Sequence, residues 1–545
     1  MKEEIGKIFR GEILDDETTL KTYSRDASLF EVRPKLVAFP RDSEDLKNLV
    51  KWAKENPGHS VTVRAAGSDM TGGPLGESII ADVTKYMNKM GEIPEHRGLT
   101  SVLVEPGMFY REFERKTLEK GLILPCFPAS KNLCALGGMF GNNCAGEKSL
   151  RYGKMENFIL ETKVIFSDGN EYTIRPLYRT ELDTKMAQGD FEGNVYKKLF
   201  GLIENNKEII AQAKPRVSKN SAGYYLWNVL SRALDTFDLN KLLVGSQGTL
   251  GIVTEMKLKL VPIKKHHDLV TIFFKSWEEL PQVVNAVLPL DPESLETFDK
   301  DTLKLGIHFM PEIAKKSGSN LLSFALKFLP EALIGIEMRG LPKLVVLVEI
   351  SENTEEEVKN KVQNVVKAIK PFNIWSRVVK KDSEEEKFWV MRRESFNLLR
   401  QHVKEKRAAP FIDDFCISPD KVPEFLPRIL KILRENSIEA NIAGHAGNGN
   451  FHIIPLMDLR RETERAKIPV VADKFYDLVA EYKGTITAEH NDGIVRTPYL
   501  GKMYSPEILE LFKKTKEIFD PLNIFNPGKK VGGTLEYLES HIIIE

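Results

Sequence analysis

Cysteine is scarce in this sequence, which has four in 545 residues: Cys126, Cys134, Cys144 and Cys416. None of them belongs to a C-x-x-C pair, the spacing that commonly binds iron–sulfur clusters or structural zinc. The cysteines therefore predict neither kind of centre. So few cysteines are also typical of a reducing compartment, and we expect a cytoplasmic protein that is either soluble or in peripheral contact with a membrane.

The sequence also lacks an excess of charge of either sign, because 78 Lys and Arg residues balance 78 Asp and Glu residues. A neutral chain has no general attraction to polyanions, so we expect no nucleic-acid partner. We expect no membrane-spanning helix, because the sequence has no run of about 18 uncharged apolar residues, and no secretory signal, because the first residues, MKEEIGK, lack an apolar core. The composition, 42% hydrophobic and 29% charged, is that of a globular protein with more than one domain.

Two short stretches concentrate histidine, glycine and acidic residues. His445 and His452 lie seven residues apart in AGHAGNGNFHII (443–454), and Glu489 and His490 follow in AEHNDGIVR (488–496). Imidazole and carboxylate are ligands that zinc-type ions prefer, so His445, His452 and Glu489 would form a three-ligand set with an open position. His490 would then be available as a base near neutral pH. The alternative is two glycine-rich turns whose histidines only satisfy local hydrogen bonds.

Three stretches of small residues alternate with expected strands in the N-terminal half: 64–73 (RAAGSDMTGG), 135–146 (ALGGMFGNNCAG) and 242–254 (LLVGSQGTLGIVT). Small residues allow a backbone to approach a ligand closely, and successive N–H groups suit a pyrophosphate. The first stretch is neither the G-x-G-x-x-G of a Rossmann turn nor a Walker loop. The alternative for this first stretch is an ordinary surface turn. Together the three stretches predict one long ligand that is bound along its length.

These motifs, taken in order, resemble those of the FAD-linked oxidases of the vanillyl-alcohol-oxidase/PCMH superfamily, in particular the D-lactate and D-2-hydroxyacid dehydrogenase branch that includes the D subunit of glycolate oxidase. The resemblance spans about residues 20–530. It rests on the three small-residue stretches and on three later motifs: GHAGNGNFH (444–452), AEHNDG (488–493) and FDPLNIFNPGK (519–529). This chain departs from the family pattern at Asn448, Ala488 and Gln247, and at Ile454, where some relatives keep a polar residue.

The resemblance implies an α+β fold in three parts. Residues 1–31 would form an N-terminal helical segment, and residues 32–262 a PCMH-type FAD-binding domain of two subdomains. Residues 263–545 would form a ferredoxin-like α/β cap that carries the substrate and metal residues, followed by a C-terminal helical segment. Expected strands at 268–274 and 343–349, which alternate with expected helices at 354–369 and 421–436, favour such a cap.

The resemblance also implies roles for individual residues. His445, His452 and Glu489 would bind a divalent metal (zinc, manganese or iron), and His490 would be the catalytic base. Because His59 and His96 lie outside the flavin motifs, we expect FAD to be bound noncovalently. The implied FAD-binding residues are Arg64, Ala65, Ala66, Gly67, Ser68, Asp69, Pro128, Gly138, Asn142, Ala145, Gly146, Tyr152, Gly248, Ile252, Val253 and Asn526.

An arginine in FWVMRRE (388–394) resembles the family's W-x-x-R, whose guanidinium contacts the substrate carboxylate. The position favours Arg392 over Arg393, and the planar guanidinium fork matches a carboxylate bidentately. The alternative is a solvated arginine on a helix face. Arg496 is a second candidate for an anion contact. Residues 308–341 form an apolar insertion, which we interpret as a helical pair that covers the core of the cap; the alternative is a partner or membrane surface.

The implied activity is oxidation of a small D-2-hydroxy acid, such as D-lactate or D-2-hydroxyglutarate, to the 2-oxo acid. Electrons would leave through a quinone, an electron-transferring flavoprotein or a separate iron–sulfur subunit, and we expect a homodimer. Two alternatives remain open. One is a transferase that uses FAD without net oxidation, similar to the synthases of ether lipids. The other is a non-catalytic flavin subunit of an electron-transfer complex.

Overall fold

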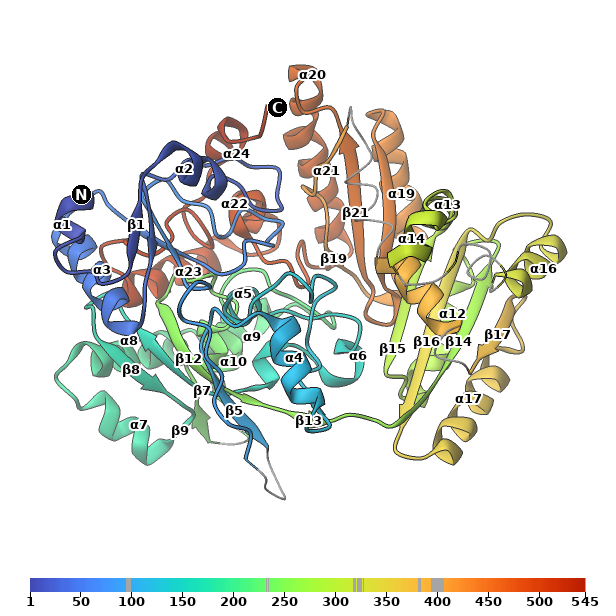
Figure 1. Ribbon diagram of the computed structural model, residues 1–545, viewed down its shortest axis with the longest axis horizontal. Coiled ribbons are helices and arrows are strands. Elements are labelled where there is room, and N and C mark those ends of the chain that lie inside the picture. The colour runs from blue at the N-terminus through green and yellow to red at the C-terminus, as the bar shows by residue number, and fades with distance from the viewer. Residues whose placement is uncertain are drawn as a thin grey trace.

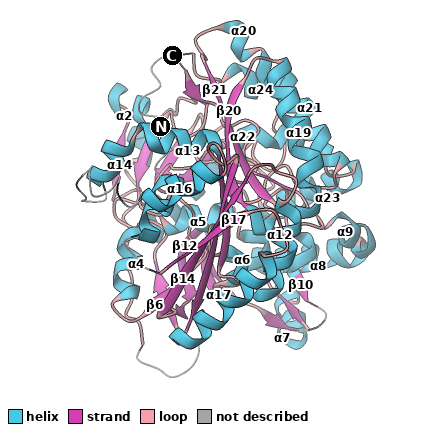
Figure 2. Ribbon diagram, turned by 90° about the vertical axis from the view of Figure 1, so that its right-hand side faces the viewer, coloured by secondary structure: helices cyan, strands magenta, loops and turns pink. Residues whose placement is uncertain are grey.

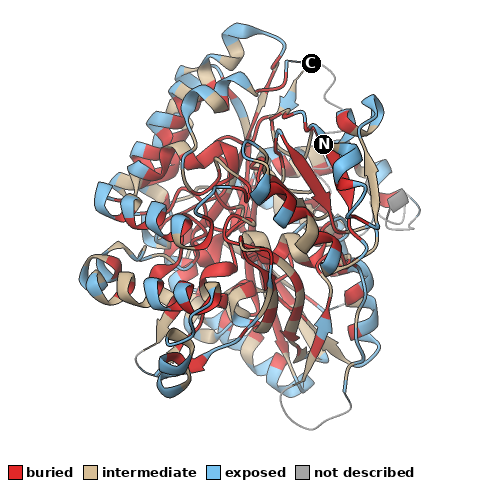
Figure 3. Cartoon of the chain, turned by 90° about the vertical axis from the view of Figure 1, so that its left-hand side faces the viewer, coloured by how far each residue is buried: buried red, intermediate tan, exposed pale blue. Residues whose placement is uncertain are grey.

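The computed structural model describes residues 1–94, 100–231, 233, 235–316, 320, 326, 328–380, 384–393 and 406–544. The chain forms two lobes that lie side by side (Figure 1). Residues up to about 260, blue to green in Figure 1, build one lobe, and most of the later residues build the other. The final helices, drawn in red, return to the first lobe. Buried residues follow the sheets, and exposed residues lie on the outer faces of the helices (Figure 3).

The first lobe carries the three small-residue stretches predicted to bind flavin, and we call it the flavin lobe. Its first sheet has the order β1-β2-β4-β3. Its parallel core consists of β2 (Leu36–Phe39), β4 (Ile79–Asp82) and β3 (Val61–Arg64), and β1 (Glu12–Leu14) adds an antiparallel edge. Helices α1 (Lys2–Ile5) and α2 (Glu17–Tyr23) flank β1, so the segment predicted to be helical over residues 1–31 is only partly helical. A three-residue strand is too short to show the alternation by which a strand is recognised.

Helix α3 (Ser43–Glu55) connects β2 to β3 and is well specified by the sequence. The Asp42 carboxylate caps it by accepting bonds from the amides of Glu44 and Asp45, and Leu46, Leu49 and Val50 are buried on its inner face. Such a cap satisfies amides that the helix leaves without partners. The packed helix fixes β3, and β3 runs directly into the small-residue loop at 64–73.

The second sheet of this lobe is antiparallel, in the order β5 (Ser101–Val104), β12 (Ile252–Lys259), β7 (Ile159–Ile165) and β8 (Glu171–Ile174). Alternate residues along β12 are buried, as expected for a strand with one face on the core. The other elements of the lobe are α4 (Tyr110–Leu118), β6 (Leu122–Ile123), α5 (Leu136–Asn142), α6 (Ser149–Tyr152), β9 (Leu177–Tyr178), α7 (Arg179–Met186), α8 (Phe191–Asn205), α9 (Lys207–Ala213), α10 (Leu226–Val229), β10 (Leu230–Ser231), β11 (Thr236–Phe237), α11 (Asn240–Leu243) and β13 (Val261–Pro262).

The second lobe is built on one antiparallel sheet. Its first strands and helices follow the order β14 (His266–Phe274), α12 (Leu280–Val287), β15 (Ser294–Asp299), β16 (Leu344–Glu352), α17 (Glu355–Ile369) and β17 (Trp375–Val379). In the sheet these strands lie in the order β17-β14-β16-β15, that is 4-1-3-2. This is the ferredoxin-like arrangement, so the predicted cap is confirmed.

The cap sheet continues from β15 through β20 (Glu439–His445) to β21 (Asn450–Met457), which pairs with β18 (Arg407–Ala408) and β19 (Phe415–Cys416). Helices α12, α19 (Val422–Glu435) and α21 (Lys467–Glu481) lie on one side of the sheet. On the other side lie α13 (Lys300–His308), α14 (Met310–Lys316) and α16 (Leu329–Glu337) (Figure 2). A short helix, α20 (Glu462–Arg465), precedes α21.

The insertion at 308–341 has one face on the cap and one in solvent. Phe309, Ala314 and Met338 are buried, which agrees with a helical layer over the cap's own core. On the outer face of α16, Leu329, Leu333 and Ile336 are 57–73% exposed. The interpretation as a partner or membrane surface stays a prediction, and Leu321 and Phe324 of this segment lie outside the described residues. Among the helices that are described, none is long and apolar enough to cross a membrane.

The end of the chain belongs in space to the flavin lobe. Helices α22 (Gly493–Arg496), α23 (Pro506–Phe519) and α24 (Leu535–Ser540) lie there in Figure 1. Ile524 and Phe525 pack in the core of the first sheet, and Phe525 forms a parallel bridge with Val61. The segment 263–545 is therefore not one spatial unit, because its last part completes the first lobe rather than the cap.

Candidate active site

One large cavity, of about 1200 Å³, lies between the lobes. Its wall includes all three small-residue stretches of the first lobe and, from the cap, Arg392, His445, His452, Glu489 and His490. The residues predicted for a long ligand and those predicted for catalysis, far apart in the sequence, thus share one wall.

The loop that follows β3 is organised by Asp69. One carboxylate oxygen accepts hydrogen bonds from the amides of Thr71 and Gly73, both at 2.9 Å, and from the Thr71 hydroxyl at 2.7 Å. The other oxygen accepts from the Asn142 side chain at 2.7 Å, which ties the loop to α5. Asp69 therefore holds two of the predicted ligand-binding stretches together.

Two glycines on the wall leave room for a ligand. A Cβ added to Gly138 would meet only the Ala65 methyl, at 3.6 Å, and one added to Gly248 would meet nothing within 4 Å. Gly248 also has a φ of +68°, a conformation that favours glycine. The cavity is large enough for a dinucleotide, and these residues fit the close backbone approach that FAD requires.

Three of the predicted FAD-binding residues do not line the cavity. The Gly146 backbone packs against Phe127, whose carbonyl oxygen would lie 1.9 Å from an added Cβ. Tyr152 lies in α6, which contacts cap strand β15. The Asn526 amide donates to the carbonyls of Gly73 and Gln247 at 2.9 and 2.8 Å, so it links two of the stretches. The residues that do line the cavity are Arg64, Ala65, Ala66, Gly67, Ser68, Asp69, Pro128, Gly138, Asn142, Ala145, Gly248, Ile252 and Val253.

The β20–β21 hairpin explains why the two histidines meet. In the pairing register His452 lies opposite Ala443, and His445 lies two residues further along β20, opposite Asn450. Residues opposite each other or two apart share one face of a sheet, so both imidazoles project from the same face. Their ring centroids are 5.4 Å apart.

The loop that carries Glu489 and His490 is wrapped around a buried carboxylate. One oxygen of Asp414 accepts bonds from the amides of Ala488, Glu489 and His490 at 2.7–3.0 Å, and from the Thr487 hydroxyl at 2.8 Å. Its other oxygen accepts from the Asn450 side chain at 3.0 Å. Asp414 is thus fully engaged as an anchor that places Glu489 and His490 over the hairpin.

His445, His452 and Glu489, called the triad below, meet at one oxygen of the Glu489 carboxylate. Oε1 of Glu489 lies 3.1 Å from Nε2 of His445 and 3.3 Å from Nε2 of His452. Ligand atoms that surround a zinc-type ion at about 2.0–2.2 Å are separated by about this much. A different set, Asp414, His452, Glu489 and His490, also clusters here. We favour the first set because the hydrogen bonds to Asp414 already occupy its oxygens.

Two further carboxylates, Glu296 and Asp413, orient the histidines through their Nδ1 atoms. Glu296 on β15 lies 2.6 Å from Nδ1 of His445, and Asp413 lies 3.0 Å from Nδ1 of His452 and 2.8 Å from Nδ1 of His490. A carboxylate on one ring nitrogen places the proton there and leaves the other nitrogen to bind a metal or accept a proton. In His445, His452 and His490 a carboxylate thus occupies Nδ1 and leaves Nε2 for a metal or a proton.

These contacts set the charge of the site. Burial lowers the pKa of His452, but hydrogen bonds to Asp413 and Glu489 raise it to about 10. Burial likewise lowers the pKa of His490, but the charges of Asp413 and Asp414 raise it above its ordinary value. A cation at the triad would oppose both shifts, because it repels a second positive charge.

Arg392 and Arg393 both line the cavity, but they differ in how many of their guanidinium donors already have partners. The Nε and NH2 groups of Arg393 are engaged by Glu147. Arg392 pairs with Glu296 through NH2, while its buried Nε has no hydrogen-bond partner among the described residues. Arg392 therefore has one guanidinium donor that no described residue engages. Arg496 is wholly buried, is not part of the wall, and donates to the backbone oxygens of Asn491 and Asp413, so it holds the loop rather than an anion.

Four residues that support the triad were not predicted from the sequence: Glu296, Asp413, Asp414 and Lys219. A signal was present for some of them. Glu296 lies in a strand whose residues are all buried, and Asp413 and Asp414 interrupt an apolar run. Charged residues are almost never fully buried without partners. Lys219, whose Nζ lies 2.9 Å from Glu489, had no comparable signal, because charged and polar residues surround it in the sequence KPRVSKNS (214–221).

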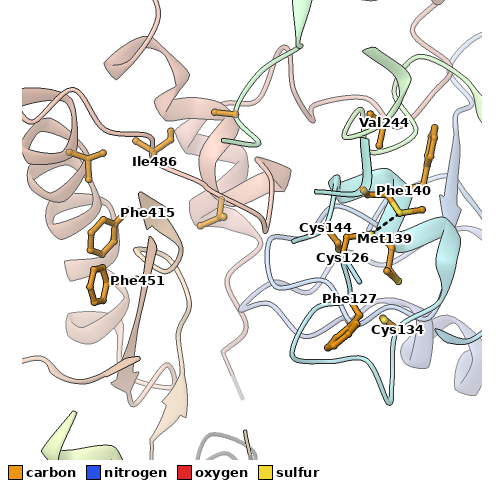
Figure 4. Close-up of a cluster of buried hydrophobic side chains, with 14 of the residues drawn as sticks. Cys126, Phe127, Cys134, Met139, Phe140, Cys144, Val244, Phe415, Phe451 and Ile486 are labelled. Carbon is orange, nitrogen blue, oxygen red and sulfur yellow. Dashed lines mark hydrogen bonds between the residues drawn. The ribbon is translucent and has the colours of Figure 1, made fainter. Parts of the chain in front are cut away.

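All four cysteines are free and buried, and burial raises the pKa of each thiol. Cys126, Cys134 and Cys144 lie near α5 among Phe127, Met139 and Phe140, whereas Phe415 and Phe451 stack in the cap (Figure 4). In the part of the chain that is described, the group of residues able to hold a metal contains no cysteine. The thiols therefore act here as packing residues.

Comparison with known proteins identifies both halves of the chain. Residues 34–175 match the model of the FAD binding domain, and residues 263–530 match that of the FAD linked oxidases, C-terminal domain. D-2-hydroxyglutarate dehydrogenase of Escherichia coli is 25% identical over 530 residues, which are 96% of this chain and 50% of that protein. D-lactate dehydrogenase of Archaeoglobus fulgidus is 25% identical over 519 residues, 93% of this chain and 96% of that protein.

The chain thus spans about half the length of the first of these relatives. Among solved structures, an alkyldihydroxyacetonephosphate synthase has a TM-score of 0.64 at 15% identity, covering 96% of this chain and 84% of that one. At that identity the likeness shows the fold alone. With both domains matched in order, and with the flavin cavity between them, the chain belongs to the FAD-linked oxidases of the vanillyl-alcohol-oxidase/PCMH superfamily.

Proposed function

We propose that this protein oxidises a D-2-hydroxy acid to the 2-oxo acid, with FAD as the immediate acceptor. The observation that carries the proposal is the shared wall, on which the flavin loops face Arg392, His490 and the His445–His452–Glu489 triad. A hydroxy acid needs all three elements: a cation for its carboxylate, a base for its hydroxyl proton, and a hydride acceptor beside its α-carbon.

The protein's own residues bind and deprotonate the substrate in this proposal. Arg392, whose Nε has no partner among the described residues, contacts the substrate carboxylate through its guanidinium, and Glu296 holds the guanidinium in place. Asp413 keeps a proton on Nδ1 of His490, so that Nε2 accepts the proton of the substrate hydroxyl. His490 also stacks on His452 at 4.9 Å, which fixes the plane of its ring.

The two bound groups supply the chemistry that side chains lack. When bound, FAD supplies a hydride acceptor, and a divalent metal held by His445, His452 and Glu489 supplies a Lewis acid that makes the hydroxyl more acidic. We propose that the FAD is noncovalent. In support, the histidines on the described wall are those of the cap, His59 lies off the wall, and His96 lies outside the described residues.

The electrons then pass to a second acceptor. The relatives named above act on D-2-hydroxyglutarate and D-lactate by their names, and we propose a substrate of this class for the present chain. Because the cysteines are buried as isolated thiols, we propose that the acceptor is a separate quinone, electron-transferring flavoprotein or iron–sulfur subunit. The homodimer and the peripheral membrane contact remain predictions.

The test is an anaerobic titration of the flavin spectrum of the purified protein with D-lactate, D-2-hydroxyglutarate and their L-enantiomers. We expect the D-forms alone to bleach the flavin band, and the better substrate to do so faster. A flavin band that no hydroxy acid bleaches would contradict the proposal. Activity with an acyl-dihydroxyacetone phosphate would then indicate the transferase, and reduction only by a partner protein would indicate a non-catalytic subunit.

Replacing Gly138 by leucine should remove the flavin. The new side chain would project from α5 into the cavity without backbone strain, since Gly138 is helical. We expect flavin occupancy, measured as the ratio of flavin to protein absorbance, to fall by at least about tenfold. Gly201→Leu is the matched control, because Gly201 is also helical with open space around its Cα but lies off the wall. Full occupancy in Gly138→Leu would mean that FAD does not lie along α5.

Replacing Arg392 by lysine should weaken substrate binding. Lysine keeps the charge but loses the planar fork, so we expect the KM for the hydroxy acid to rise about 10- to 100-fold, with a smaller change in kcat. Arg393→Lys is the control, since Glu147 already engages the donors of Arg393. Equal effects of the two substitutions would refute the assignment of Arg392 as the carboxylate contact.

A further inference from the structure

A lysine from the flavin lobe reaches the metal-ligand triad of the cap. Nζ of Lys219 lies 2.9 Å from Oε2 of Glu489 and 3.3 Å from Oδ1 of Asn450. The Lys219 side chain is only 2% exposed. A buried ammonium group is stable only when it is paired. The ion pair with Glu489 therefore allows Lys219 to be buried at this site.

The segment around Lys219 is fastened to both histidine-bearing loops. The Ser218 hydroxyl donates to the carbonyl of Asn448 at 2.6 Å, next to the hairpin turn. The Ser221 amide donates to the carbonyl of Thr487 at 3.0 Å, and the Ser221 hydroxyl accepts from the amide of Asn491 at 3.1 Å. These bonds on either side of Lys219 fix its ammonium group over Glu489.

The two oxygens of Glu489 have different partners. Oε1 faces Nε2 of both His445 and His452, at 3.1 and 3.3 Å. Oε2 faces Lys219 instead. Only one oxygen of this carboxylate is therefore directed at the centre of the triad. The two histidines are neutral as ligands, so the charges of Glu489 and Lys219 cancel.

We propose that Lys219 is a positioning residue that keeps Glu489 a one-oxygen ligand and neutralises its charge. The inference rests on the proposed function, in which the triad binds a divalent metal. Because the Lys219 ammonium offsets the one anionic ligand, a bound metal would keep more of its positive charge, which would attract an anionic hydroxy acid and make its hydroxyl more acidic. A one-oxygen carboxylate also leaves more coordination positions for the substrate. Lys219 thus weakens metal binding while it strengthens the chemistry.

Three substitutions separate charge from hydrogen bonding. Lys219→Met removes both, Lys219→Gln keeps a donor for Oε2 without charge, and Lys219→Arg keeps the charge. The control is Lys154→Met, since Lys154 is also buried but donates to the Asn220 carbonyl and the Tyr225 hydroxyl rather than to Glu489. Flavin content and the melting temperature show which variants are folded.

The first readout is the affinity for Zn²⁺ and Mn²⁺ alone, measured by competition with a fluorescent chelator and without substrate. We expect Lys219→Met and Lys219→Gln to bind the ion at least about tenfold more tightly than the wild type, because the carboxylate is no longer neutralised. Lys219→Arg and Lys154→Met should keep the wild-type affinity. If Lys219→Met does not fold, Lys219→Gln alone decides the question.

The second readout is the rate of flavin reduction at saturating hydroxy acid. It should fall about 10- to 100-fold in the Met and Gln variants although the metal is held more tightly. Unchanged or weaker metal binding in both variants, or no metal binding by the wild type, would overturn the inference. Because the affinity is measured without substrate, this result is independent of the proposed oxidation, which fails only if hydroxy acids do not bleach the wild-type flavin.

Discussion

Replacing His490 by glutamine should slow the reduction of the flavin by a D-2-hydroxy acid by about 10²- to 10⁴-fold, the usual contribution of a general base. Glutamine has a similar length but accepts no proton at neutral pH. His490 is not a member of the favoured ligand set, and its Nε2 lies 4.0 Å from Glu489. Flavin and metal contents should therefore remain those of the wild type. Stopped-flow spectra of the anaerobic reaction give the rate.

The control for this variant is His308→Gln, because His308 is exposed on α13, away from the cavity. It should reduce its flavin at the wild-type rate. A His490→Gln variant that also keeps the wild-type rate would exclude His490 as the base. Loss of the metal from that variant would instead support the alternative ligand set that includes His490.

Replacing Asp413 by asparagine should have an effect of similar size, about 10³- to 10⁴-fold, as found when an orienting carboxylate is lost from a histidine-based site. Asp413 is fully buried and accepts from Nδ1 of both His452 and His490, one on each oxygen. Asparagine has one accepting oxygen and one donating amide. It can serve only one histidine, and the other must move its proton to Nε2.

The two outcomes are distinguishable by metal analysis. If His452 moves its proton to Nε2, it can no longer bind the metal, and Asp413→Asn loses the metal. If His490 moves its proton to Nε2 instead, the metal stays, but His490 can no longer accept the substrate proton. Asp458→Asn is the control, because Asp458 follows β21 and binds the exposed Arg460. Full activity with full metal content in Asp413→Asn would show that neither histidine depends on this carboxylate.

The architecture of the cap was predictable because it depends on long, regular elements. Strand β14, strand β16 and helix α17 differ from their expected ranges by three residues at most, and their 4-1-3-2 order follows from the family. The edge of the flavin lobe was not predictable in the same way. The three residues of β1 carry too little pattern, and pairing with Leu36–Phe39 rather than local preference makes them a strand.

Much of the site could be located from the sequence, but its supporting groups could not. The spacing of His445 and His452 becomes meaningful once they lie on one hairpin face, and the family motifs supply Glu489 and His490. Lys219, Glu296 and Asp413 come from three other segments, and only the tertiary fold brings them to the triad. Conversely, Gly146 and Asn526 lie in the family's flavin motifs but do not line the cavity. Gly146 packs against the backbone of Phe127, and Asn526 links two of the loops.

The return of the chain to the first lobe has a consequence for biosynthesis. Phe525 pairs with Val61, the Asn526 amide bonds to Gly73 and Gln247, and Nζ of Lys529 donates to the carbonyl of Leu75 at 2.6 Å. The loops that surround the cofactor are thus fastened by residues that the ribosome makes more than 400 residues after Leu75. Domains generally fold as they emerge, N-terminal first, but here the nascent first lobe is left unfastened until residues 525–529 have been translated. We therefore expect the flavin to bind only after residues 525–529 have emerged from the ribosome.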